Sequence, residues 1–442
     1  MTRHRAITAL VGILCTATLQ TAGCAATQQV QVVSALEARN VTEALAAYER
    51  MREAEGADSA LLARIAALIL ESEALADNHP TQDASFSQLT AAGTAAHPTL
   101  QRLADDDAHP RQKAHALSIL ASHGDAAARA ELRALLDSDD SDIRAYALAS
   151  VNVVDDAPTL AAALAHTSGA VRLAAANVSA QGPLVPELVL ALTDASRNDP
   201  LPSVRAACVR ALSRGGSEAV EALRERLSDP SEAVRMAAVG ALAVADRVRA
   251  REILTSLLAM GPNSASIEAA RVLAMPIEGD DRGVVDARAF LLRGLRAAEP
   301  ALRTQSAVAL AGLPSDASMN DTLLSAMEND ADASVKLLLA ATMLTHVGAE
   351  QRARAVLHSL FAPMSMNAVQ AAAALAKEHD REAMHVLAVA LRESNAAYRR
   401  VSARAVARDA MLPDLVRRAL ADEDAMVRIV TAGAILSAES AR

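Results

Sequence analysis

The feature that most constrains the fold is a short motif that returns along the chain at a nearly constant interval. It reads Asp, a short gap, Val-Arg and then small apolar residues, as in "DPLPSVRAACVRAL" at residues 199–212 and "DPSEAVRMAAVGAL" at residues 229–242. Copies aligned on the residue after the Val-like position, which we call the anchor, lie 28 to 35 residues apart. A period in this range is typical of a solenoid of stacked repeats. The eleven anchors are Lys113, Arg144, Arg172, Arg205, Arg235, Glu268, Arg303, Lys336, Gln370, Arg399 and Arg428.

Each repeat contains two stretches with helical periodicity. Val220 and Leu223 share a face in the first stretch of one repeat, and Val234, Ala238 and Leu242 share a face in the second. Hydrophobic residues make up 52% of the chain but only three Tyr and three Phe are present, so Ala, Leu, Val and Met must fill the core. These residues favour helix over strand. The predicted fold is all-α, a right-handed solenoid of stacked antiparallel helix pairs.

The turn between the two helices carries the recurring Asp. Asp229 suits the N-cap of the second helix, with Pro230 at the first helical position and Glu232 at the capping-box site. The anchor Arg235 follows six residues after the Asp. Six residues leave two side chains roughly 120° apart on a helix, which makes a direct pair within one repeat awkward.

Stacked repeats would instead let each anchor reach the Asp of a neighbouring repeat. We expect a ladder of such bridges to set the register, with about 0.2–1 kcal/mol from each exposed rung. Burial of one Leu or Val contributes about 1.5–3 kcal/mol, so the apolar faces supply most of the cohesion. The predicted ladder residues are Asp107, Lys113, Arg144, Arg172, Asp199, Arg205, Asp229, Arg235, Arg303, Asp330, Lys336, Arg399, Asp422 and Arg428.

A helix pair with a turn Asp and a following Val-Arg resembles the HEAT repeat, of the short kind also found in phycobilin-lyase-type proteins. The resemblance covers residues 99–442. Glu268 and Gln370 depart from its basic anchor, so we expect the ladder to be interrupted there. Residues 24–98 are more divergent and are predicted to form an N-terminal helical cap. The stretch "MPIEGDDRGVVD" at 275–286 is expected to be a long loop between repeats, or alternatively a hinge or contact loop.

The start of the chain has the pattern of an export signal. A basic beginning, "MTRHR", precedes an apolar stretch at residues 6–19 that is too short to span a membrane. The following "TAGC" resembles a bacterial lipoprotein signal, which implies removal of residues 1–23 and lipidation of Cys24. Thr21 departs from that pattern, and ordinary cleavage near Ala26 or an uncleaved anchor are the alternatives. The resemblance implies a cell-envelope protein, and the absence of an acidic residue after Cys24 favours the outer membrane, facing the periplasm.

The cysteine count leaves no pair for a disulfide in the mature chain. Cys15 lies within the signal and Cys24 is assigned to the lipid, so Cys208 remains alone. It lies among alanines on a helical face, where a small buried hydrophobic role is expected.

The sequence contains no pattern that predicts catalysis. It lacks a metal-binding "HExxH", a Gly-rich phosphate loop and a "GxSxG" nucleophile motif. The acidic run at 137–142 lacks the Gly and terminal Glu of a calcium loop. His379 and His385 lie six residues apart, at the wrong helical angle for one metal ion. We therefore expect no catalytic, cofactor or metal site, and the net charge of −10 disfavours a nucleic-acid partner.

These observations predict an exported, lipid-anchored and non-enzymatic scaffold that binds a protein partner along its solenoid surface. One alternative is a chromophore-handling enzyme, by analogy to the phycobilin-lyase relatives. A second is self-assembly through the last helix, which has no following repeat to cover it, unless that helix packs wholly onto its own repeat. The predicted exposed contact face consists of Ile429, Val430, Ile435 and Leu436.

Overall fold

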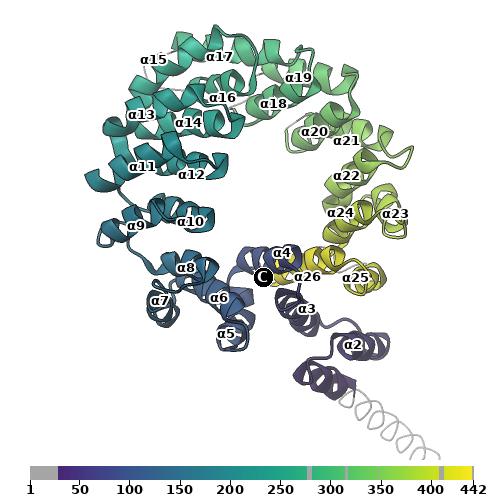
Figure 1. Ribbon diagram of the computed structural model, residues 1–442. Helices are drawn as coiled ribbons and strands as arrows, with labels where there is room; N and C mark the ends of the chain where they lie inside the picture. Colours follow the sequence, from purple (N-terminus) through teal and green to yellow (C-terminus); the bar gives the residue numbers. More distant parts are fainter. Residues whose placement is uncertain (1–27, 276–280, 314–316, 347, 408–412, 441–442) are drawn as a thin grey trace, which may run out of the picture. The chain divides into compact units, whose positions relative to one another are not determined.

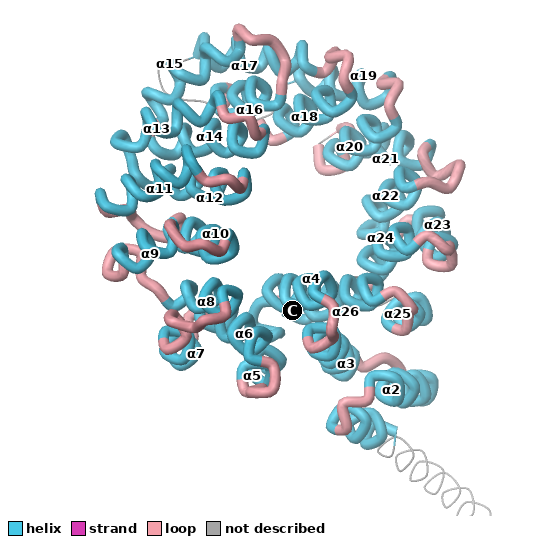
Figure 2. Tube along the Cα trace, viewed as in Figure 1, coloured by secondary structure: helices cyan, strands magenta, loops and turns pink. Residues whose placement is uncertain are grey.

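Antiparallel helix pairs follow one another along the chain (Figures 1 and 2). The computed structural model describes residues 28–275, 281–313, 317–346, 348–407 and 413–440. These residues form α-helices, short 3-10 helices and turns, and none of them forms a strand. The predicted all-α solenoid is therefore confirmed.

The chain divides into two compact units. The first is discontinuous and combines Met1–Gln112 with Ala376–Arg442, whereas the second is the continuous stretch Lys113–Leu375. The N-terminal helices therefore share a unit with the C-terminal ones.

The second unit is a stack of short helix pairs. Its second helices pack in succession, α10 on α12, then α14, α16, α18 and α20. The helices are α7 (Ala126–Arg133), α8 (Ser141–Ala147), α9 (Ala157–Leu164), α10 (Gly169–Ser179), α11 (Pro186–Asn198), α12 (Pro202–Leu212), α13 (Val220–Glu225), α14 (Glu232–Ala245), α15 (Arg247–Leu258), α16 (Ser264–Leu273), α17 (Asp281–Gly294), α18 (Pro300–Ala311), α19 (Ala317–Asn329), α20 (Ala333–Met343), α21 (Glu350–Ser359) and α22 (Met366–Leu375). Helix α6 (Pro110–Ser122) crosses the boundary between the units.

Small aliphatic side chains fill the space between successive second helices. In α12 the side chains of Val204, Val209 and Leu212 are fully buried, and so is Cys208 between them. Each buried Leu or Val of this kind contributes about 1.5–3 kcal/mol. Small aliphatic residues therefore supply most of the core, as the sequence predicts, and Phe290 and Phe361 are the buried aromatic residues among the described part of this unit.

The first unit brings the two ends of the chain together. Helix α26 packs against both α3 and α4, and α24 packs on its other side (Figure 1). The helices of this unit are one over residues 28–37, then α2 (Val41–Glu55), α3 (Ser59–Ala74), α4 (His79–Ala91), α5 (His97–Ala104), α23 (Arg381–Ala390), α24 (Ala396–Val406), α25 (Pro413–Leu420) and α26 (Ala425–Ser440).

The C-terminal face that the sequence predicts to be exposed is covered. Ile429, Ile435 and Leu436 retain 0%, 7% and 3% of their accessible surface, and Val430 is half-buried. Helix α3 supplies a complementary apolar surface, in which Ile65 is fully buried. The expectation of an uncapped last helix is corrected by this packing, because the covering helices come from the other end of the sequence.

Close approach of α26 to α4 depends on a glycine. A Cβ atom at Gly433 would lie 2.7 Å from the Cβ of Gln88 and 2.2 Å from its Oε1. Real Cβ atoms do not come so close to other heavy atoms, so a larger residue at this position would push the two helices apart. Helices α26 and α4 are thus packed so closely that only glycine fits at residue 433.

Candidate functional site

A repeated ion pair joins successive second helices. In α12, Arg205 donates from Nε and Nη2 to the two carboxylate oxygens of Asp229, at 3.0 and 2.9 Å. The Arg205 and Asp229 side chains are only 11% and 2% exposed. Asp229 lies in the turn before the next second helix, so the pair links two repeats rather than two residues of one repeat.

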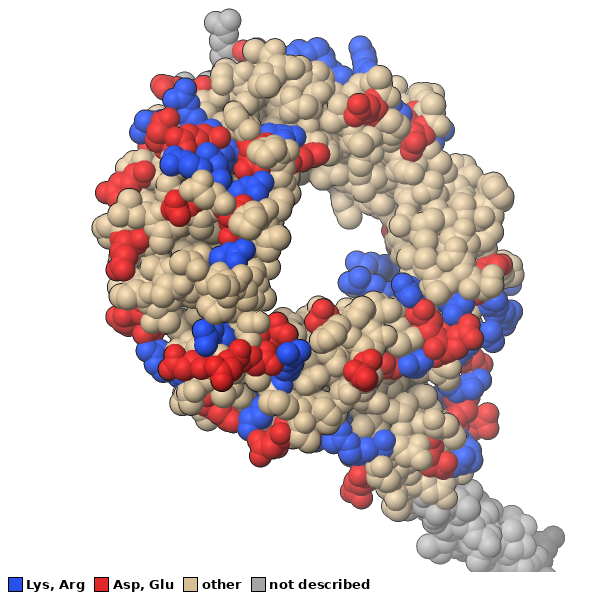
Figure 3. Space-filling model, viewed as in Figure 1, with Lys and Arg blue, Asp and Glu red and all other residues tan. Residues whose placement is uncertain are grey.

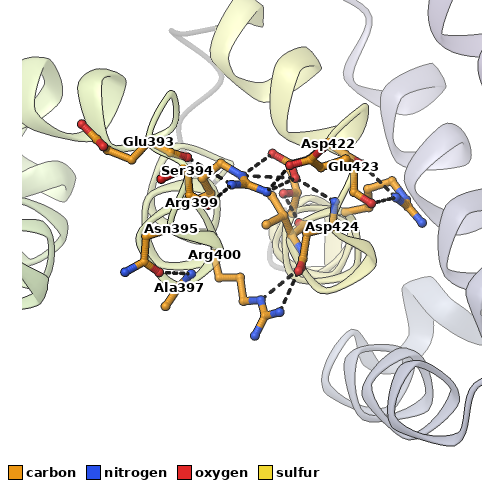
Figure 4. A network of polar contacts seen from close by, with 12 residues as sticks. Glu393, Ser394, Asn395, Ala397, Arg399, Arg400, Asp422, Glu423 and Asp424 are labelled. Carbon is orange, nitrogen blue, oxygen red and sulfur yellow. Dashed lines mark hydrogen bonds and ion pairs between the residues drawn. The ribbon is translucent and has the colours of Figure 1, made fainter.

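The same two-point contact recurs in both units. Three further anchors place Nε and a terminal nitrogen on the aspartate carboxylate of the repeat that follows (Figure 4 shows the last case). The pairs are Arg172–Asp199 at 2.6 and 3.2 Å, Arg303–Asp330 at 2.8 and 2.9 Å, and Arg399–Asp422 at 2.9 and 3.0 Å.

The six-residue spacing has a direct structural cause. Nη1 of Arg205 donates to the backbone carbonyl of Asp199, six residues earlier, at 2.9 Å. Arg235 bonds the carbonyl of Asp229 in the same way, also at 2.9 Å. Each turn therefore gives its carbonyl oxygen to its own anchor and its carboxylate to the anchor of the preceding repeat. We call the residue six before an anchor the turn position.

The turn aspartate is not the helix N-cap that the sequence predicts. Helix α14 begins at Glu232 after the N-cap residue Ser231, whose side chain makes no capping bond. The Asp229 carboxylate instead accepts from the backbone N–H of Ser231 at 2.8 Å, inside the turn. The N-cap lies two residues later than expected, and the Asp229 carboxylate is thereby left to pair with the anchor of the preceding repeat.

Burial changes the energetics expected for the ladder. Loss of one partner from a buried ion pair leaves an uncompensated charge and costs about 3–5 kcal/mol, well above the contribution of an exposed pair. Burial raises the pKa of Asp229, but the hydrogen bonds from Arg205 and the Ser231 amide outweigh it, so the net pKa lies below its usual value. The pKa of Asp330 is lowered by the same balance with Arg303. Asp229 and Asp330 are therefore held charged at neutral pH.

The remaining predicted ladder residues make other contacts. Lys113 pairs with Glu131 of α7 at 2.8 Å. Arg144 donates to the carbonyl of Ser138 at 3.0 Å, and its Nη1 lies 3.1 Å from Nε2 of His166, which occupies the next turn position. Lys336 lies near Asp330 of its own repeat and helps to lower its pKa.

The ladder is interrupted wherever either member of a rung is missing. Glu268, at an anchor, pairs with Arg271 of its own helix, with two contacts of 2.8 and 2.5 Å. Gln370 is exposed, and so is Asp107, in the turn before α6. Arg235 is a basic anchor, yet the next turn position is Pro262, which has no carboxylate. A basic anchor therefore does not predict a rung unless the next turn position also carries a carboxylate, and the interruption at Arg235 was not predicted.

The last anchor is completed by the N-terminal region. Arg428 donates from Nη1 to the carbonyl of Asp422 at 2.8 Å, as the other anchors do to their own turns. Its Nε donates to Oε1 of Glu73 in α3 at 2.9 Å, and its Nη2 contacts the same oxygen. Glu73 thus takes the place of a following turn aspartate, although it lies at the opposite end of the sequence.

A second series of ion pairs joins successive first helices on the surface. This series was not predicted, although Arg133 and Arg197 lie near the ends of their first helices with an acid at or on the next one, which could have indicated those two pairs. The half-exposed arginines make these contacts weak and sensitive to salt. The pairs are Arg133–Asp156, Arg197–Glu225 at 2.5 Å, Arg352–Glu328 at 2.6 Å and, within the first unit, Arg417–Glu49 at 3.6 Å.

Cys208 is buried in α12, near the Arg172–Asp199 ion pair. Burial raises the pKa of its thiol to about 12, which keeps it protonated at neutral pH. The residue therefore packs as a small hydrophobic side chain, as expected. In the part of the chain that the structure describes, no three His, Cys, Asp or Glu side chains are grouped to hold a metal ion.

Comparison with known proteins finds a repeat family that matches part of the second unit. Residues 189–274, which include the Arg205–Asp229 rung and Arg235, match the family model of HEAT repeats. No curated protein matches the chain. Among solved structures, that of a karyopherin bound to a SUMO protease is similar at 14% identity and a TM-score of 0.32. The match covers 92% of this chain but only 49% of that one, so this chain spans about half the length of its structural neighbour.

Two surface properties complete the description. On the face drawn in Figure 3, acidic and basic side chains lie interspersed. Among the described residues, no helix has the length and apolar character needed to cross a membrane.

Proposed function

We propose that the protein is an exported, lipid-anchored and non-enzymatic scaffold that binds a protein partner along its HEAT-type helix pairs. The observation that carries the proposal is the use of the repeated residues. In the complete rungs, the anchors and turn aspartates form ion pairs between successive repeats. The charged motif therefore holds a stack of helices in register. A stack of this kind presents an extended surface made of many similar helices, which is suited to protein recognition.

Export and lipidation rest on the sequence of residues 1–27, which lie outside the described residues. A basic start, a short apolar stretch and "TAGC" support removal of the signal before Cys24 and attachment of lipid to it. The first described helix begins at residue 28, four residues after Cys24. The lipid would hold the scaffold at a membrane, with the outer membrane as the proposed destination.

Expression of the wild type and Cys24→Ala in a Gram-negative host tests both parts. Metabolic labelling with an alkyne fatty acid should label the wild type and not the variant, and the variant should move to the soluble fraction. Crosslinking in the same host, followed by affinity purification at low salt, should recover one defined protein with the wild type. Equal labelling of both chains contradicts the anchor, and recovery of no protein under low salt contradicts the scaffold.

A further inference from the structure

Arg235 has two guanidinium nitrogens, Nε and Nη2, that have no carboxylate partner in the next turn. We call these two nitrogens the fork. Nη1 of Arg235 is fixed by the carbonyls of Asp229 and Pro230 at 2.9 and 3.0 Å. The same contact fixes Nη1 in the complete rungs, where Nε and Nη2 then meet the next aspartate. Among the residues described, no carboxylate bonds to the Nε or Nη2 of Arg235, whose side chain is half-buried.

The turn before α16 provides no side chain that replaces the missing aspartate. Helix α14 packs against α16 as α12 packs against α14, so the turn before α16 takes the place that Asp229 occupies in the preceding repeat. Asn263 and Ser266 form a capping box in which each side chain bonds the backbone N–H of the other residue, at 3.1 and 2.9 Å. Met260, in the same turn, is 72% exposed. The turn is thus complete without Arg235 and presents an apolar side chain to solvent.

The chain itself shows that an anchor can take a carboxylate from a distant segment. Arg428 has the same Nη1 contact to its own turn and fills its fork with Glu73, more than 350 residues away in the sequence. A planar guanidinium in a fixed orientation recognises carboxylate by two parallel hydrogen bonds. The fork therefore needs a correctly placed carboxylate but not a consecutive repeat.

The repeats after Arg235 also differ from the rest of the described chain in their exposed apolar side chains. Ten large hydrophobic side chains are exposed among the described residues, and half of them lie between residues 244 and 285. These are Val244, Val248, Met260, Met275 and Val285. Met260 belongs to the turn before α16, which is the turn that a complete rung of Arg235 would join. Exposed apolar side chains are typical of a surface that a partner covers.

We infer that Arg235 is a recognition site for a carboxylate side chain of the protein partner, with Met260 at its edge. The partner segment is acidic and completes the interrupted rung in trans, as Glu73 completes the last rung in cis. This inference rests on the proposed function, because it names the chemistry by which the scaffold recognises its partner.

Binding of a defined peptide tests the site on the full mature chain. The probe is a fluorescein-labelled peptide of alternating Glu and Ala, and the same peptide with Gln for Glu is the matched control. By fluorescence anisotropy at low salt, the wild type should bind the Glu peptide about tenfold or more tightly than Arg235→Gln does. Arg235→Lys should also bind weakly, because a lysine cannot form the two-point contact.

Two further variants separate the site from general electrostatics. Pro262→Asp supplies the missing carboxylate within the chain and should abolish peptide binding without removing any positive charge. Arg210→Gln removes an exposed arginine of α12 that is outside the ladder, and should bind the Glu peptide like the wild type. Circular dichroism melts of each variant establish that it is folded. Equal binding by the wild type, Arg235→Gln and Pro262→Asp, or equal binding of the Glu and Gln peptides, would overturn the inference.

Failure of the site and failure of the scaffold proposal give different results. If the wild type and Arg235→Gln recover the same partner equally from the host, the scaffold stands and Arg235 is not its recognition site. If neither recovers a partner, the scaffold proposal itself is contradicted. Loss of recovery in Arg235→Gln and Pro262→Asp together, with Arg210→Gln unchanged, supports both.

Discussion

Two neighbouring stretches of the second unit use one motif to different effect. From Arg172 to Asp229, each anchor finds the aspartate of the next repeat and the rungs follow one another without a gap. From Arg235 to Arg303, the pattern has a proline at a turn position and a glutamate at an anchor. Both stretches remain stacked helix pairs. Apolar packing therefore maintains the stack. The ion-pair rungs add to it and can be absent from one stretch, which leaves the anchor of that stretch able to bind something else.

The largest expected effect is at a complete rung. Arg205→Ala should destabilise the second unit by about 3–5 kcal/mol, because Asp229 would keep a buried charge without its partner. Arg235→Ala should cost much less, since no carboxylate is left unpaired. Hydrogen exchange of the amides in α12 and α14 measures the local change, which a single melting temperature would average over many repeats. Similar losses in the two variants would remove the distinction between the stretches.

The contact between α26 and α4 tests how much the first unit depends on close helix packing. Gly433→Ala forces a Cβ against Gln88 and should cost about 1–3 kcal/mol in the first unit. Gly240→Ala in α14 is the matched control, because a Cβ there meets nothing within 4 Å and alanine favours helix. Urea titration of both variants should show a lower midpoint only for Gly433→Ala. An unchanged midpoint for that variant would contradict the tight fit of α26 on α4.

Acid should weaken the rungs that Asp229 and Asp330 complete. The pKa values of Asp229 and Asp330 are lowered in the folded chain, so their contribution to stability is full above the unfolded pKa of about 4. It is lost as the pH falls through the lower folded value. Between pH 7 and pH 3, Asp229→Asn should therefore lose less stability than the wild type, as measured by hydrogen exchange in α12. A parallel decline in both chains would argue against a charged Asp229.

The smallest expected effect is a repair. His166 occupies the turn position opposite Arg144, where complete rungs have aspartate. His166→Asp should form a new rung and raise stability by up to about 1 kcal/mol, because the position is only half-buried. The gain should disappear when Arg144 is replaced by Gln, and a double-mutant cycle of the melting curves isolates the interaction. A gain that persists without Arg144 would show that the aspartate acts on its own turn alone.

The sequence predicts the fold because the repeat is visible in local residues. The patterns used all lie within one or two repeats: the period, the helical spacing and the interval between anchor and turn. They predict a ladder of ion pairs between neighbouring repeats. Three features depend on residues far apart or on exact turn length, and they were missed or misread. The turn Asp229 lies before the N-cap, Pro262 removes the partner of Arg235, and α3 covers Ile435. No local pattern reports that Glu73 would stand in for a turn aspartate of the last repeat.

The pairing of α3 with α26 also has a consequence for how the chain reaches its final state. A ribosome releases α3 hundreds of residues before α26, so an apolar helix made early must wait for a partner made much later. The stretch between them can fold repeat by repeat as it emerges, but the first unit can be completed only after α26 has been made. Truncation of the final helix should consequently expose α3 to proteases while the central repeats stay resistant.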